Sequence, residues 1–408
     1  MEERRNVRYK NLLILAGVLC FVLLLPGCQR RSDPVPSPVS TPMPTPKPTP
    51  EPTPTPSPTP PPVKIAGMSV SWDAQELNLS VAAEETADKA ADAAELAAAL
   101  RQLPLLQSVD LRGRELSIDD QLALQGEFSG INFLWEVDVL GIKVGSADEH
   151  IILDDIPMTD TAALEKVLPL LPNVKKIDMC RCGLDDETMY ELNQRHEGIK
   201  FVWLTYIGNS LQRTDITSFC ANTVGLLVHA TDEKLMTQLK YFPDLVALDL
   251  GHSGMEISNL SWLAWVPNLE ILILVGCDVR DVTPIAELKE LSYLELFTNT
   301  YLIDISPLAK LPKLRDLNLS ITSVDDISAL HGMPSLRRLW VNGCMKLSKE
   351  QVDAFWHATP DCGISFMYDS SGAKNGWRQD DRYFWMRDMF DAHYMPVKKE
   401  MRWSLTTE

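Results

Sequence analysis

The stretch that decides the fold is Leu314-Arg-Asp-Leu-Asn-Leu-Ser-Ile-Thr322, which has apolar residues at positions 1, 4 and 6 and a small polar residue at position 9. The pattern recurs at intervals of 22 to 24 residues, and its copies start at Thr223, Leu245, Leu269, Leu291, Leu314 and Leu336. Side chains alternate between the two faces of a strand, so positions 4 and 6 predict a short strand with one buried face in each copy. The regular period predicts a repeat array.

Position 9 of each copy carries a residue that can hydrogen-bond to backbone groups where the chain leaves the strand. The six residues are Thr231, Ser253, Cys277, Asn299, Thr322 and Cys344. We interpret Cys277 and Cys344 as interior residues of a ladder, and Cys182 as an earlier equivalent. The alternative is a redox or ligand role for these thiols.

The second half of the repeating unit recurs as Val282-Thr-Pro-Ile285, Ile305-Ser-Pro-Leu308 and Ile327-Ser-Ala-Leu330. Together with the strand pattern, these residues resemble the leucine-rich repeats of the internalin type. The resemblance implies an α/β fold, a leucine-rich-repeat solenoid whose strands form a curved parallel sheet.

A longer repeat precedes this array. Leu103–Leu111 recurs as Leu171–Met179, and Ile131–Trp135 recurs as Ile199–Trp203, both at an offset of 68 residues. Agreement over a whole unit predicts two duplicated strand-helix-strand modules ahead of the leucine-rich repeats.

Each duplicated module contains an amphipathic segment between its paired strands, at 118–127 and 185–195, which predicts a helix. Upstream, Val63-Lys-Ile65 matches Ile142-Lys-Val144. The acidic, alanine-rich stretch 82–94 of the first module is interpreted as a surface helix extension.

A cap is expected after the last repeat, because a bare repeat would expose an apolar cross-section. Ser348-Lys-Glu-Gln351 has the form of a capping box, Val352 and Phe355 supply a buried stripe, and 364–367 is expected to close the sheet.

The aromatic and arginine-rich stretch 376–390 has two interpretations. It is a ligand-binding tail, or it is a docked cap in which aromatic side chains are buried and arginines pair with Asp380, Asp381 and Asp388. The spacing of its aromatic residues favours the docked cap.

Several short motifs carry a wider resemblance: Met179–Gly183, Phe201–Trp203, Leu211–Asp215, Leu248–His252, and Gly376-Trp-Arg378 with Arg382-Tyr383. Together they look like an uncharacterised family of leucine-rich-repeat proteins from gut-type Firmicutes. The resemblance covers nearly all of the chain after the proline-rich spacer and implies a cell-surface setting. It carries over no catalytic residue.

The first 27 residues are expected to be a lipoprotein signal peptide. A basic head precedes an apolar run from Leu12 to Leu25, and Leu25-Pro-Gly-Cys28 resembles a bacterial lipobox. The resemblance implies lipidation of Cys28, although Pro26 departs from the usual small residue. The alternative is a retained membrane anchor, but this run falls short of the roughly 20 residues that span a bilayer.

Residues 28–62 are expected to form a disordered spacer, because 15 of the 29 residues in 34–62 are proline. Proline fixes φ and removes a donor, so this segment predicts a polyproline II rod of roughly 90 Å. The remaining boundaries are 63–215 for the two modules, 216–346 for the leucine-rich repeats and 347–408 for the C-terminal cap.

Composition and motifs argue against several chemistries. A net charge of −18 disfavours nucleic acid and anionic lipid surfaces as partners. There is no phosphate loop, no nucleophile elbow and no zinc-protease motif, and Cys180 and Cys182 are too close for the usual metal knuckle. We therefore expect a binding protein without cofactor or metal. An extracytoplasmic enzyme or a structural envelope protein, with the repeats as scaffold, is the alternative.

The binding face is predicted from the pleat, because positions 3, 5 and 7 point away from positions 4 and 6. Its predicted residues are Asp249, Ile271, Ile273, Val275, Tyr293, Glu295, Phe297, Asp316, Asn318, Arg338 and Trp340. Tyrosine, tryptophan and arginine dominate binding energies, so this concave face is expected to take a protein or another cell-surface ligand at the outer face of the bacterial membrane. Two alternatives remain open: the C-terminal aromatic segment folds back onto this face, or the face is a ladder that only stabilises the sheet.

Overall fold

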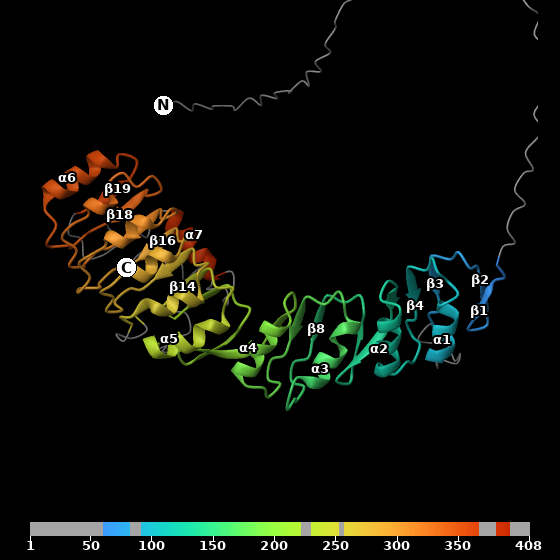
Figure 1. Cartoon of the computed structure of the whole chain (residues 1–408). Coiled ribbons are helices and arrows are strands. Elements are labelled where there is room, and N and C mark those ends of the chain that lie inside the picture. Colours follow the sequence, from blue (N-terminus) through green and yellow to red (C-terminus); the bar gives the residue numbers. More distant parts are fainter. Residues whose placement is uncertain (1–59, 82–90, 222–229, 253–256, 367–380, 392–408) are drawn as a thin grey trace, which may run out of the picture. The chain divides into compact units, whose positions relative to one another are not determined.

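The computed structural model describes residues 60–81, 91–221, 230–252, 257–366 and 381–391. Contacts divide the chain into 1–59 and 60–408, and Figure 1 labels many of the elements of the second unit. Some predictions lie outside the described residues: the signal peptide, Cys28, the spacer up to Thr59, most of the alanine-rich stretch, Ser253, and residues 367–380.

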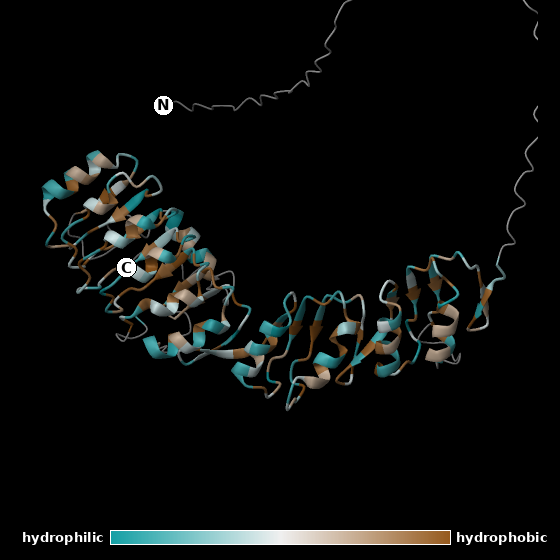
Figure 2. Cartoon of the chain, in the orientation of Figure 1, coloured by the Kyte–Doolittle hydropathy of each residue, from teal (hydrophilic) through white to brown (hydrophobic). Residues whose placement is uncertain are grey.

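The repeats form one seven-stranded parallel sheet in which strands follow one another in chain order. The strands are β13 (Ser218–Cys220), β14 (Ala247–Asp249), β15 (Ile271–Ile273), β16 (Tyr293–Glu295), β17 (Asp316–Asn318), β18 (Arg338–Trp340) and β19 (Gly363–Ser365). The position-4 residues of neighbouring repeats lie opposite one another, as Leu294 does to Leu317, and both are fully buried. In Figure 2 these strands carry both hydrophobic and hydrophilic colours. The predicted strand in each repeat is confirmed from β14 to β18.

Short 3-10 helices form the other side of the coils: η3 (Leu260–Trp265), η4 (Thr283–Glu287), η5 (Ser306–Lys310) and η6 (Ser328–Leu330). Each of the last three helices begins two residues after an aspartate. Asp281 accepts a hydrogen bond from the backbone N–H of Thr283, and Asp304 and Asp326 do the same for Ser306 and Ser328. Buried residues such as Ile285 and Leu308 then pack against the strands.

The prediction that the first copy of the repeat starts at Thr223 is wrong. The strand that pairs with β14 is β13, in which Phe219 lies opposite Leu248 and is fully buried. Thr231, expected at position 9, is instead the N-cap of α5 (Asp232–Gln238), which continues into η2 (Leu239–Tyr241). The apolar run 224–228 imitates the repeat pattern, but these residues lie outside the described part of the chain.

The position-9 ladder is observed in the described repeats. Cys277 Sγ lies 3.4 Å from the carbonyl oxygen of Leu250, and the Cys344 thiol lies 3.1 Å from that of Leu319. Cys182 makes the equivalent contact to Leu153 at 3.2 Å. These three cysteines are buried free thiols, in agreement with the sequence interpretation.

Two small parallel sheets form the duplicated modules. The first contains β3 (Glu76–Asn78), β4 (Ser108–Asp110) and β5 (Asn132–Leu134), and the second contains β8 (His150–Ile152), β9 (Lys176–Asp178) and β10 (Lys200–Val202). Val109 pairs with Phe133, and Ile177 pairs with Phe201, so the offset of 68 residues is kept in the register.

Helices lie beside these sheets: α1 (Ala93–Leu100), α2 (Ile118–Glu127), α3 (Ala162–Val167) with η1 (Leu168–Leu170), and α4 (Asp186–Arg195). The helices predicted over 118–127 and 185–195 are present as α2 and α4. Ser117 and Asp185 act as N-caps, accepting hydrogen bonds from the backbone of Asp120 and Thr188.

Each small sheet is flanked by antiparallel hairpins: β1 (Val63–Ile65) with β2 (Met68–Val70), β6 (Glu136–Val139) with β7 (Ile142–Gly145), and β11 (Leu204–Ile207) with β12 (Ser210–Arg213). The predicted match of Val63–Ile65 to 142–144 is wrong by one strand. Val63–Ile65 is β1, the first strand of its hairpin, whereas 142–144 lies in β7, the second strand of its hairpin. The turns agree with this correction: Ala66 and Leu140 both have positive φ, and a glycine follows each.

The C-terminal end contains α6 (Lys349–Ala358) and α7 (Asp381–Asp391). Ser348 and Gln351 form the predicted capping box, and Val352 and Phe355 are buried as expected. The closing strand β19 begins at Gly363, one residue earlier than predicted. It extends the sheet beyond β18, so the last leucine-rich repeat is covered by one more strand and α6.

Candidate binding surfaces

The eleven predicted binding residues lie on β14 to β18 or just after these strands, and we call them the sheet face. The strand register brings them together: Asp249 lies opposite Ile273, Glu295 lies opposite Asn318, and the next partner of Asn318 is Trp340. The pleat argument therefore identified the members of one face correctly.

The sheet face is not exposed, and this corrects the sequence expectation. Tyr293 and Asp316 are 0% exposed and Trp340 is 8% exposed, while Phe297 is half-buried. Helix α7 contacts this face, which agrees with the alternative in which the C-terminal aromatic segment folds back onto it.

One stripe of α7 provides the apolar contact. Met386 and Phe390, four residues apart, are 1% and 0% exposed, and they belong to one cluster with Ala247, Ile271 and Tyr293. Residues four apart share one side of a helix, so this stripe faces the sheet. Burying two such side chains favours docking by about 3 to 6 kcal/mol.

A carboxylate of the sheet binds α7 through an ion pair. Arg382 Nε lies 2.9 Å from Asp316 Oδ2, and Arg338 Nε lies 2.6 Å from Asp316 Oδ1. The arginines of this segment were expected to pair with nearby aspartates of their own stretch, so the partner of Arg382 was missed. Arg382 also stacks on Trp385, with its Cζ 3.7 Å from the ring centroid.

Two further acidic residues lie on the sheet face. Glu295 accepts a hydrogen bond from the Tyr293 hydroxyl at 2.6 Å, and burial raises the pKa of Tyr293 well above its usual value. Cys220 Sγ lies 3.1 Å from Asp249 Oδ2, and burial raises the pKa of the Asp249 carboxyl. Arg387 of α7 opposes that change through its charge. The acidic residues of the sheet face and the arginines of α7 are thus complementary in charge.

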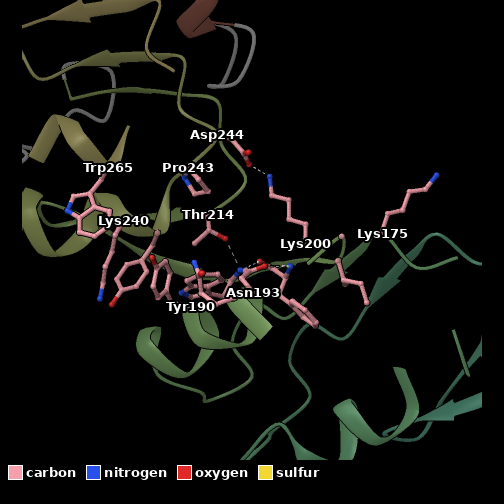
Figure 3. Close-up of a pocket in the computed structure, with 15 residues that line it drawn as sticks. Lys175, Tyr190, Asn193, Lys200, Thr214, Lys240, Pro243, Asp244 and Trp265 are labelled. Carbon is pink, nitrogen blue, oxygen red and sulfur yellow. Dashed lines mark hydrogen bonds and ion pairs between the residues drawn. The ribbon is translucent and has the colours of Figure 1, made fainter. Parts of the chain in front are cut away.

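A second candidate surface, which the sequence analysis missed, is a groove of about 500 Å³ between the second module and the first repeats. Figure 3 shows side chains that line it, from α4, β10 and the segment that follows η2, with Trp265 from η3. No repeat position signals it, because its walls come from segments up to 90 residues apart, Lys175 to Trp265.

The described residues offer no evident metal site or membrane span. Within the described ranges, no three His, Cys, Asp or Glu side chains gather in a way that could hold a metal ion. No helix in those ranges is long and apolar enough to cross a bilayer. Cys180, whose pKa burial raises to about 11, is a buried free thiol.

The comparisons with known proteins concern the fold. No protein-family model matches the chain, and no curated protein matches it. Among solved structures, an internalin (inlF) from Listeria monocytogenes is similar at 17% identity, with 74% of this chain and 84% of that chain covered and a TM-score of 0.32. A leucine-rich-repeat protein of Leptospira interrogans is similar at 14% identity, with 65% and 74% covered and a TM-score of 0.32.

The functional domain of InlJ from Listeria monocytogenes, described as including a cysteine ladder, is similar at 14% identity, with 66% of this chain and 60% of that chain covered and a TM-score of 0.28. The structural neighbours named here are thus internalin-like and other bacterial leucine-rich-repeat proteins.

Proposed function

We propose that this chain is a lipid-anchored recognition protein at the outer face of a bacterial membrane, and that its sheet face binds an amphipathic helix of a partner protein. In the free protein, α7 occupies that face. The partner is a helix with an arginine and large apolar side chains at four-residue spacing.

The seating of α7 is the observation that carries this proposal. The face combines an apolar surface, around Ile271 and Tyr293, with the carboxylates of Asp249, Glu295 and Asp316. An amphipathic helix that lays an apolar stripe into a groove is a recurring mode of recognition. Charge complementarity adds specificity for helices that carry arginine.

A partner helix must compete with α7, and this competition sets the affinity. A tethered segment acts at an effective concentration near the millimolar range, so a free helix binds weakly until α7 is released. The apparent dissociation constant rises in inverse proportion to the fraction of open molecules. We therefore expect tight binding only from a partner that matches the face better than α7 does.

The lipid anchor is supported by the basic head, the apolar run and the Leu25-Pro-Gly-Cys28 ending. The proline-rich spacer then holds the folded part away from the bilayer. Metabolic labelling with a palmitate analogue is expected to mark the wild type and not Cys28→Ala. Labelling of Cys28→Ala, or an intact Met1 on the mature protein, would contradict the anchor.

The binding role is tested with a full-length variant whose α7 is loosened by Met386→Ser and Phe390→Ser. A fluorescent peptide of residues 378–394 should bind this variant saturably, as measured by anisotropy, and should bind the wild type at least about tenfold more weakly. Circular dichroism establishes that the repeats remain folded. If the folded variant does not bind the peptide, the sheet face does not accept helices in trans and the proposal fails.

A further inference from the structure

The groove beside α4 and β10 is walled by aromatic rings. Tyr190 and Trp203 each contact Tyr241 edge to face, at centroid distances of 5.7 and 5.8 Å. Trp203 and Tyr241 are buried, whereas Trp265 is 40% exposed at the surface. A volume of about 500 Å³ lies within the range of about 300 to 1,000 Å³ that is typical of ligand sites.

The cations of the groove are already neutralised. Lys240 Nζ lies 2.6 Å from Glu187 Oε2 and within 5.2 Å of the ring centroids of both Tyr190 and Tyr241. Lys200 is paired with Asp244, and this pair is drawn in Figure 3. The third lysine, Lys175, is paired with Glu149.

These ion pairs decide the class of ligand. Each pair carries no net charge, and both members of the Lys200–Asp244 pair line the groove, so N–H donors lie there beside a carboxylate acceptor. An anion would gain little from such a groove, because the carboxylate beside each lysine repels it. A hydroxyl group, which donates and accepts at once, matches a lysine–carboxylate pair.

We infer that this groove binds a neutral oligosaccharide, with the apolar C–H face of a sugar ring on Trp265 and sugar hydroxyls on Lys240 and on the Lys200–Asp244 pair. Aromatic faces carry partial negative charge and attract the C–H groups of a sugar ring. The site is distinct from the sheet face and does not depend on whether α7 opens.

Its test uses the full-length protein and three neutral hexasaccharides: maltohexaose, cellohexaose and chitohexaose. Each is titrated to about 10 mM with calorimetry as the readout, which detects affinities down to the millimolar range. We expect saturable binding of at least one of them. No binding of any of the three overturns the inference.

Matched tryptophan variants then locate the site. Trp265→Ala is expected to weaken binding at least about tenfold, and Trp265→Phe, which keeps a flat ring, to recover part of the loss. Trp356→Ala is the control, because Trp356 is exposed on α6 and does not line the groove. Equal binding by Trp265→Ala and the wild type overturns the inference. So does Trp265-dependent binding of hexaglutamate in place of the sugars, since that would make the site one for acidic peptides.

Discussion

Arg382 of α7 and Asp316 of β17 are 66 residues apart in sequence, and their side chains form an ion pair at 2.9 Å. Asp316 is fully buried and is also paired with Arg338 of the neighbouring strand. A buried carboxylate is stable only when its charge is compensated, so the sheet requires cations at this point. One of the two comes from the helix, which couples α7 to the sheet.

Replacing Arg382 by alanine should therefore loosen α7 without unfolding the repeats. Loss of a charged hydrogen bond costs about 1.5 to 3 kcal/mol, which corresponds to roughly tenfold to hundredfold faster amide exchange in α7. Hydrogen-exchange mass spectrometry measures this directly. Arg280→Ala is the control, because Arg280 pairs with Asp278 at the surface. Unchanged exchange in α7 would show that the Arg382–Asp316 pair does not hold the helix.

The position-9 ladder predicts unequal costs for two substitutions. The Asn299 side chain donates to the carbonyl oxygens of Leu274 and Leu296 and accepts from the N–H of Val279. Asn299→Ala removes the side-chain partner of the Leu274 carbonyl oxygen and of the Val279 N–H, whereas the Leu296 carbonyl oxygen keeps the backbone N–H of Asn299, and the free energy of unfolding should fall by about 2 to 4 kcal/mol. Cys277→Ser keeps the contact and should cost about 1 kcal/mol or less. Urea unfolding of both variants tests the ranking, and equal costs would contradict it.

Thiol chemistry provides an independent check of the same ladder. Burial raises the pKa of Cys277 to about 12, so little thiolate is present near neutral pH. Rapid labelling of Cys277 in the folded protein by a bulky reagent would contradict the assignment.

Local patterns in the sequence predicted much of the fold, because their physical causes are local. Period-2 alternation identified Leu294, Leu317 and their equivalents as core residues, and the same pleat identified the members of the sheet face. The capping box at Ser348 and the helix over 118–127 also depend on neighbouring residues.

Long-range contacts account for what the sequence left open or predicted wrongly. Whether the sheet face is exposed depends on α7, and no local pattern links Arg382 to Asp316. The first repeat was misplaced because the run 224–228 satisfies the apolar pattern as well as Phe219 does. The sequence analysis missed the groove because Tyr190 and Trp265, which both line it, come close only when the chain is folded.

Two glycines allow a matched test of the backbone. Gly113 has a φ of +77°, and an added Cβ would clash with the carbonyl oxygen of Val81. Gly126 lies in α2, and a Cβ there would meet nothing within 4 Å. Gly113→Ala should destabilise by more than about 2 kcal/mol, whereas Gly126→Ala should stabilise by about 0.5 to 1 kcal/mol. Thermal or urea unfolding gives both values, and a Gly113→Ala protein as stable as the wild type would disprove the backbone clash.

Acid stability should depend on Glu165. Its hydrogen bond from Arg195 at 2.9 Å lowers the pKa of Glu165 from 4.5 to about 2, although burial acts against this. A carboxyl whose pKa is lower in the folded state stabilises the protein fully above its unfolded pKa. This contribution, on the order of 1 to 3 kcal/mol, is lost as the pH falls from about 4.5 towards 2.

Glu165→Gln removes the titrating group, so its unfolding free energy should depend less on pH between about 5 and 3 than that of the wild type. Glu191→Gln is the control, because Glu191 pairs with the same Arg195 at the surface at 3.5 Å. Parallel pH profiles for the wild type and Glu165→Gln would exclude this source of acid sensitivity.

The central claim is that the sheet face recognises a helix by its arginine and its apolar stripe. The most direct measurement is an anisotropy titration of the loosened full-length protein with three peptides of residues 378–394: the native sequence, Arg382→Ala and Asp381→Asn. Arg382 reaches Asp316, whereas Asp381 is exposed. We predict that Arg382→Ala raises the dissociation constant about tenfold or more and that Asp381→Asn leaves it within about twofold. Equal dissociation constants for all three peptides would contradict the claim.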